Sequence, residues 1–187
     1  MFYWEQDNPD LENIPNPRIF STHMHFNMLP VSIHASNCRI IHICRNPLDQ
    51  FVSHINFSSQ NDFGKGTDPL AIDEAFDMYC QGINAYGPFW MISVDTGTLI
   101  WRIQKVLFLQ YEDLKEDITS QVKKIAEFIG FPFSLEEEEQ GLIDQISRLC
   151  SFESLSNLTV NKTGDINGIA KNSSFSGRDK LETGPII

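Results

Sequence analysis

Residues 39–47 read Arg-Ile-Ile-His-Ile-Cys-Arg-Asn-Pro, and this stretch decides the fold class. Its β-branched apolar run is typical of a strand buried on both faces of a parallel sheet. Asn46 followed by Pro47 is typical of a helix start, because Asn caps free backbone N–H groups and proline suits the first helical position. The stretch therefore predicts a buried strand that stops at Arg45, followed by a helix from Pro47 to about Phe57.

Other segments repeat this alternation of strand and helix. Residues 105–109 are a second candidate for a buried strand, and residues 18–23 are a candidate for a short one. Apolar residues at helical spacing predict three more helices, over residues 68–87, 117–130 and 134–149, and the last of these opens on a capping box. Strands alternating with long helices predict an α/β fold with a parallel sheet covered by helices.

The length of 187 residues suits a single domain, because one domain takes about 150 residues. Prolines and acidic side chains predict an extended lead-in over residues 1–17. The loss of apolar residues toward the end predicts a poorly ordered tail over residues 161–187. Residues 18–160 are expected to form the domain between them.

Composition limits the partners that the chain can have. It has 14 basic and 25 acidic side chains, and the resulting net charge of −11 repels nucleic acid and anionic membranes. No apolar run approaches the roughly 20 residues of a membrane span. The first residues lack the basic start and apolar stretch of a signal peptide. The sequence therefore predicts a soluble, cytoplasmic protein with no nucleic-acid or membrane partner, and we expect its 4 cysteines to be reduced.

Polar side chains stand at the carboxyl ends of all three predicted strands, namely His23, Arg45 and Tyr111. In parallel α/β sheets, ligands bind at these carboxyl ends of strands. Arg45 lies at a helix start and the hydroxyl of Ser53 lies two turns further on, a combination suited to binding phosphate. The alternative is a surface arginine that pairs with Asp49, beside a solvated serine.

His23 has three interpretations. A neutral imidazole can accept a proton from a hydroxyl, which makes His23 a candidate general base. A lone histidine is otherwise structural or merely exposed. The alternation of His23 with His25 also suggests a pair of metal ligands, but no third Cys, His or carboxylate stands at a useful spacing. We therefore predict no metal site.

Several of these motifs occur together in the order found in one enzyme family. They are residues 17–23 (PRIFSTH), 38–53 (CRIIHICRNPLDQFVS), 106–114 (VLFLQYEDL), 150–153 (CSFE) and 155–157 (LSN). Together they resemble the cytosolic sulfotransferases, and they are nearest to the plant flavonol and brassinosteroid branch. The resemblance runs from about Pro17 to Asn172, and it implies a sulfotransferase-like fold related to the P-loop NTPases.

The resemblance implies transfer of a sulfuryl group from 3′-phosphoadenylyl sulfate (PAPS) to a hydroxyl of a small molecule such as a flavonoid or steroid. His23 falls on the catalytic base of the family. Arg45 and Ser53 fall on the pair that holds the 3′-phosphate of PAPS, which agrees with the anion site inferred from the residues. Tyr111 falls on a contact of the adenine end, and Phe152 lies in a segment that packs near the same nucleotide. Tyr111 and Phe152 can also be ordinary core aromatics.

Parts of the family pattern have no match in the sequence. The first strand, phosphate loop and helix of the family have no counterpart, residues 91–104 depart from a helical stretch, and the dimer segment is not found in residues 173–187. We therefore expect a sulfotransferase truncated at both ends, which transfers sulfate more slowly than a complete relative. The alternatives are a non-catalytic relative, acting as a weak nucleotide-binding or interaction protein, and a plain α/β phosphate-binding module.

Overall fold

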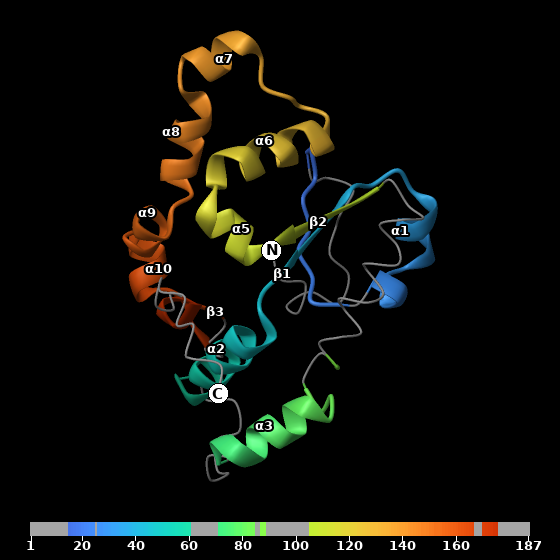
Figure 1. The fold of residues 1–187 in the computed structure, drawn as a ribbon, viewed down its shortest axis with the longest axis vertical. Coiled ribbons are helices and arrows are strands. Elements are labelled where there is room, and N and C mark those ends of the chain that lie inside the picture. The colour runs from blue at the N-terminus through green and yellow to red at the C-terminus, as the bar shows by residue number, and fades with distance from the viewer. Residues whose placement is uncertain are drawn as a thin grey trace.

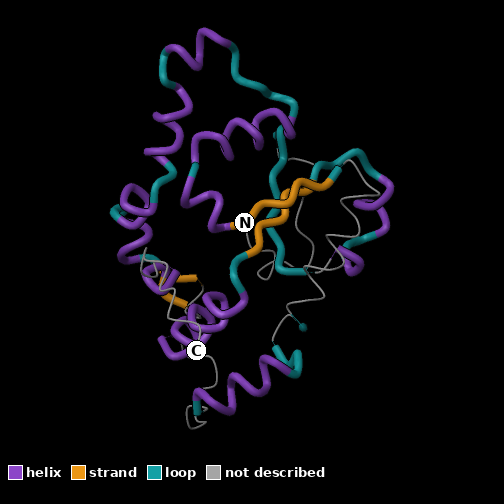
Figure 2. The backbone as a smooth tube through the Cα atoms, viewed as in Figure 1, coloured by secondary structure: helices purple, strands orange, loops and turns teal. Residues whose placement is uncertain are grey.

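The structure is a computed structural model that describes residues 15–24, 26–60, 71–84, 87–88, 105–166 and 170–175. Figure 1 shows a short sheet near the centre, with helices on several sides of it. Figure 2 separates the same chain into helices, strands and loops, and helices make up most of the described part. The architecture is therefore α/β, as the sequence predicts.

Two parallel strands form the central sheet, β1 (Ile40–Cys44) and β2 (Val106–Gln110). The two strands are in register along their whole length, so that their first residues are opposite each other and so are their last. Both apolar runs identified in the sequence are thus strands of one sheet. Leu109 of β2 is only 2% exposed, which is the burial that a parallel strand requires. Ile41 and Ile43 of β1 are 38% and 55% exposed, so the prediction that β1 is buried on both faces is wrong.

The carboxyl end of each strand leads into a helix. β1 continues through a two-residue turn into α2 (Pro47–Gln60), and β2 passes directly into α5 (Tyr111–Glu116). The other helices of the described chain are α1 (Val31–Ala35), α3 (Ile72–Cys80), α6 (Ile118–Ile129), α7 (Leu135–Glu139), α8 (Leu142–Leu149), α9 (Phe152–Ser156) and α10 (Thr159–Thr163). The described chain also has short elements, namely the 3-10 turns η2 (Phe26–Met28) and η3 (Asn172–Phe175) and the antiparallel pair β3 (Asp165–Ile166) and β4 (Ala170–Lys171).

A small core joins α2 to α3. Phe51 of α2 is buried with Ala75 and Tyr79 of α3, and Ile55 packs against them. The hydroxyl of Tyr79 donates to the carbonyl oxygen of Pro47 at 3.1 Å, and burial raises the pKa of this phenol to about 12. The core therefore fixes the start of α2, which follows the carboxyl end of β1.

Local sequence signals set the ends of α6 and α7. The carboxylate of Asp117 caps α6 by accepting the N–H of Ser120 at 3.0 Å. Gly130 ends that helix with a left-handed φ of 85°. Ser134 and Glu137 form the predicted capping box, in which each side chain accepts the backbone N–H of the other residue.

The helix predicted over residues 134–149 is two helices, so the single-helix prediction is wrong. α7 ends at Glu139 and α8 begins at Leu142. Gly141 lies between them with a φ of 69°, a left-handed conformation through which an α-helix does not continue. The chain therefore turns at this glycine.

The strand predicted over residues 18–23 is also wrong, because the structure shows a loop there. Ile19 is 90% exposed. The polar residues Arg18, Ser21 and Thr22 leave too few apolar side chains to form a buried strand. The central sheet of the described chain therefore has two strands where the sequence predicts three.

Other expectations concern the organisation of the chain. Secondary structure continues to Phe175, within the segment for which the sequence predicts a tail, and the domain boundaries stay predictions. The start of the helix at residue 68 and the departure at residues 91–104 lie outside the described residues. The four cysteines are free thiols, as expected. Among the described residues, no helix combines the length and the apolar character needed to cross a membrane.

Candidate functional site

The register of the sheet brings two of the predicted site residues together. Cys44 and Gln110 are opposite each other as the last residues of their strands, so Arg45 and Tyr111 follow at the same edge. The guanidinium carbon of Arg45 lies 4.9 Å from the centroid of the Tyr111 ring. A cation in this position over an aromatic ring gains about 0.5–2 kcal/mol. The ring therefore helps to hold the guanidinium at the strand ends.

Arg45 retains hydrogen-bonding capacity in this position. Its side chain is 29% exposed, and its nearest carboxylate oxygen, on Asp49, is 4.0 Å away, beyond hydrogen-bond length. The buried Nε of Arg45 has no hydrogen-bond partner among the described residues. The pairing with Asp49 that the sequence offers as an alternative is thus present but long. A guanidinium with an unsatisfied buried donor is suited to an anionic ligand, because buried donors are normally paired.

The turn between β1 and α2 is held by Glu112, which the sequence analysis did not identify. The backbone N–H of Asn46 donates to Oε1 of Glu112 at 2.8 Å. The side chain of Asn46 accepts the N–H of Leu48 at 2.9 Å, and so caps α2 as predicted. Glu112 follows Tyr111 directly, and a comparison of the two strand ends in register is the signal that would have found it.

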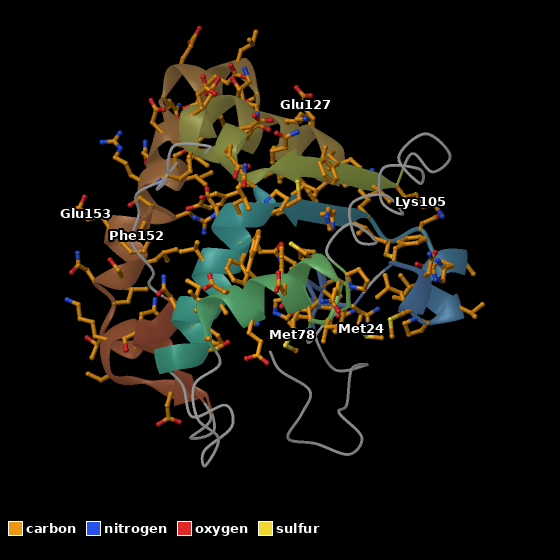
Figure 3. All side chains as sticks on the ribbon, turned by 60° about the horizontal axis from the view of Figure 1, so that its bottom comes forward. Met24, Met78, Lys105, Glu127, Phe152 and Glu153 are labelled. Atoms are coloured by element: carbon orange, nitrogen blue, oxygen red, sulfur yellow. The ribbon has the colours of Figure 1, made fainter. Side chains whose placement is uncertain are left out.

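Ser53 lies on α2, which follows β1, and Phe152 lies on α9. Ser53 is exposed on α2, two turns into the helix. Phe152 is the first residue of α9 and is 39% exposed, and Ser151 caps this helix by accepting the N–H of Ser154. Figure 3 places Phe152 on the opposite side of the molecule from Lys105, which precedes β2. Phe152 therefore lies on the side toward which the strands run.

His23 is not at a strand end. It is exposed in the loop of residues 18–24, where the hydroxyl of Thr22 accepts the N–H of Met24. Figure 3 shows Met24, the next residue, well apart from Phe152. The strand-end argument thus holds for Arg45 and Tyr111 and fails for His23, which the family resemblance alone supports as a base.

Comparison with known proteins decides the family. The family model described as "Sulfotransferase domain" matches residues 1–184. The chain belongs to the sulfotransferase family. It is 41% identical over 163 residues to cytosolic sulfotransferase 15 of Arabidopsis thaliana, covering 86% of this chain and 45% of that protein. It is 42% identical over 171 residues to flavonol 4′-sulfotransferase of Flaveria chlorifolia, covering 89% of this chain and 53% of that protein.

The structure also matches a solved sulfotransferase. A crystal structure of a mouse sulfotransferase complexed with PAP superposes with a TM-score of 0.74 at 25% identity, over 90% of this chain and 58% of that one. The described elements therefore belong to the sulfotransferase fold. The chain spans about half the length of the curated relatives that it matches.

Proposed function

We propose that this sulfotransferase-family chain binds PAPS at the joined ends of β1 and β2 and transfers its sulfuryl group to a hydroxyl of a small molecule. The observation that carries the proposal is the guanidinium of Arg45, held 4.9 Å over the Tyr111 ring, with a buried Nε that has no partner among the described residues. PAPS has a 3′-phosphate that a guanidinium suits, and an adenine that an aromatic ring suits.

Electrostatics favours a local site of this kind. The net charge of −11 repels a polyanionic ligand at long range, so affinity must come from a few cationic and N–H donors close to the phosphate. Arg45 supplies a planar fork of donors, which matches phosphate oxygens better than a point charge does. Its stacking on Tyr111 also reduces the rotamer freedom that binding would otherwise remove.

In the proposed mechanism each site residue has one task. The Arg45 guanidinium and the Ser53 hydroxyl donate hydrogen bonds to the 3′-phosphate, and Tyr111 and Phe152 contact the adenine end. His23 accepts the proton of the acceptor hydroxyl at a ring nitrogen as that oxygen forms its bond to sulfur, while the bond from sulfur to the phosphate oxygen breaks. PAPS supplies the sulfuryl group and leaves as adenosine 3′,5′-bisphosphate. A positioned general base typically contributes about 10²–10⁴-fold to the rate.

The relatives support the choice of ligand and acceptor. The mouse sulfotransferase was solved with PAP, which we take as adenosine 3′,5′-bisphosphate, and the Flaveria relative is a flavonol sulfotransferase. We therefore propose a flavonoid, a steroid or a similar small molecule as acceptor, with no metal ion, and a place in the cytoplasm like that of the cytosolic relative.

Calorimetry with adenosine 3′,5′-bisphosphate tests the donor site. Arg45→Ala should lower the affinity about 10- to 100-fold, because hydrogen bonds to charged groups are worth about 1.5–3 kcal/mol. Ser53→Ala removes a neutral donor and should cost about 2- to 10-fold. The matched control is Arg39→Ala, which removes an exposed arginine next to the other end of β1. Absence of binding by the parent chain, or an equal loss in the control, would refute the proposal.

The second candidate function is nucleotide binding without transfer. It is favoured by one observation, the position of His23 in an exposed loop and not at the end of a strand. A radiolabelled sulfate-transfer assay with flavonols and steroids separates the two candidates. Transfer that His23→Ala abolishes supports the enzyme, while nucleotide binding with no transfer supports the second candidate.

A further inference from the structure

Glu112 connects the ends of the two strands. It lies in the first turn of α5, directly after Tyr111, and its Oε1 accepts the backbone N–H of Asn46 at 2.8 Å. The two residues are 66 positions apart in the sequence. The bond therefore exists only because β1 and β2 end side by side.

The accepted N–H belongs to the peptide group that joins Arg45 to Asn46. The ladder between the strands ends at the pair Cys44 and Gln110, so backbone pairing no longer fixes the peptide groups beyond it. The carboxylate of Glu112 instead holds the second peptide group beyond the ladder, which is the one between Arg45 and Asn46. The orientation of that peptide group depends on the backbone torsion ψ of Arg45, so the hydrogen bond to Glu112 also constrains this torsion.

We propose that Glu112 is a positioning residue for the 3′-phosphate site, which acts by holding the Arg45–Asn46 peptide so that the guanidinium lies over Tyr111. The inference rests on the proposed function, because it assigns the task of Glu112 at the same site. Asn46 contributes from the other side, where its side chain holds the first turn of α2. Arg45 is thus held at two places, by the hydrogen bond of Glu112 to the peptide group that follows it and by the Tyr111 ring under its guanidinium.

The negative charge of Glu112 works against an anionic ligand, so geometry must explain its role. Burial raises the pKa of the Cys44 thiol, and the nearby carboxylate of Glu112 raises it further. The field of Glu112 therefore reaches the end of β1, where it opposes a phosphate. A neutral side chain that still accepts the Asn46 N–H should serve the site equally well, and this separates positioning from charge.

The test compares two nucleotides on the same variants. Calorimetry with adenosine 3′,5′-bisphosphate and with adenosine 5′-phosphate gives an affinity ratio that reports the 3′-phosphate alone. Glu112→Ala should reduce this ratio by about tenfold or more, since the loss of an oriented charged contact costs at least about 1.4 kcal/mol. Its affinity for adenosine 5′-phosphate should change by less than about twofold. Glu112→Gln keeps an acceptor oxygen, so its affinity ratio for the two nucleotides should equal that of the parent chain.

Two further variants complete the experiment. Asp113→Ala removes the adjacent exposed carboxylate without touching Asn46, and it should retain the ratio. Glu112→Asp keeps the charge on a side chain shorter by one methylene. Its affinity ratio should fall as far as that of Glu112→Ala. This variant therefore tests the inference if the alanine variant does not fold. An unchanged ratio in Glu112→Ala or Glu112→Asp, or an equal loss for both nucleotides, would overturn the inference. A parent chain that binds the two nucleotides equally would instead refute the proposed 3′-phosphate site.

Discussion

At the scale of single residues, His42 interrupts the apolar run of β1. Its ring is stacked on that of Phe108, with centroids 5.2 Å apart and an interplanar angle of 24°. Its Nε2 is buried and has no hydrogen-bond partner among the described residues. An unsatisfied buried polar group costs about 1–3 kcal/mol. His42 therefore lowers the stability of the sheet.

Replacement of His42 by Phe should stabilise the chain. The new ring keeps the stacking on Phe108 and removes the unpaired nitrogen, so we expect the free energy of unfolding to rise by about 1 kcal/mol at pH 7.5. Burial lowers the pKa of His42 below 6.5, so the unfolded chain binds more protons than the folded one as the pH falls below that value, and stability is lost. His42→Phe should remove this component. Urea unfolding at pH 7.5 and 5.5 measures both effects, and an unchanged pH dependence would contradict the second.

At the scale of elements, local signals predicted much of the structure and tertiary contacts account for the rest. The apolar runs predicted β1 and β2, and the pair Asn46 and Pro47 predicted the start of α2. The bond from Asn46 to Glu112 joins residues 66 positions apart, and only the strand register reveals it. Proximity of Arg45 and Tyr111 followed from the rule for strand ends. The same rule failed for His23, because the segment before it does not bury enough apolar surface to form a strand.

Gly130 and Gly141 end and begin neighbouring helices, and both have left-handed φ values, 85° and 69°. We expect Gly130→Ala and Gly141→Ala each to lower the free energy of unfolding by about 1 kcal/mol, because a Cβ is disfavoured at positive φ. A Cβ on Gly130 would also lie 2.6 Å from an Nη atom of Arg39, whereas one on Gly141 would meet open space. Since the end of an arginine side chain moves easily, the two losses should agree within about 0.5 kcal/mol.

Chemical denaturation of the two glycine variants measures these losses, and Arg39→Ala supplies the control. Combined with Gly130→Ala, it should restore little stability if the backbone conformation causes the loss. A restoration of most of the loss would show that the contact with Arg39 dominates. No loss in Gly141→Ala would show that the turn between α7 and α8 does not require a glycine.

At the scale of the whole molecule, β1 presents one apolar side to solvent, although Leu109 of β2, which lies beside Ile43 in the register, is buried. Ile41 and Ile43 point to the side of β1 opposite that of its half-buried residues, and they are 38% and 55% exposed. Parallel sheets normally have both faces covered. An exposed apolar side beside strand edges that pair with no other strand in the described part of the chain favours pairing with another chain. The net charge of −11 opposes such contact by repulsion.

We expect the 187-residue chain to self-associate through this face, and to do so more strongly at high salt. Salt shortens the Debye length from about 10 Å at 0.1 M to about 3 Å at 1 M, which screens the repulsion and leaves the apolar attraction. The double variant Ile41→Thr, Ile43→Thr keeps β-branched side chains suited to a strand and removes apolar surface, so it should remain monomeric at concentrations where the parent associates. The matched control is Ile72→Thr, Ile129→Thr, which removes the same atoms from the exposed ends of α3 and α6 and should associate as the parent does. Sedimentation velocity over a range of protein and salt concentrations measures the effect, and a parent that stays monomeric at 1 M salt, or a control that dissociates as fully as the sheet variant, would show that this face is not the site of contact.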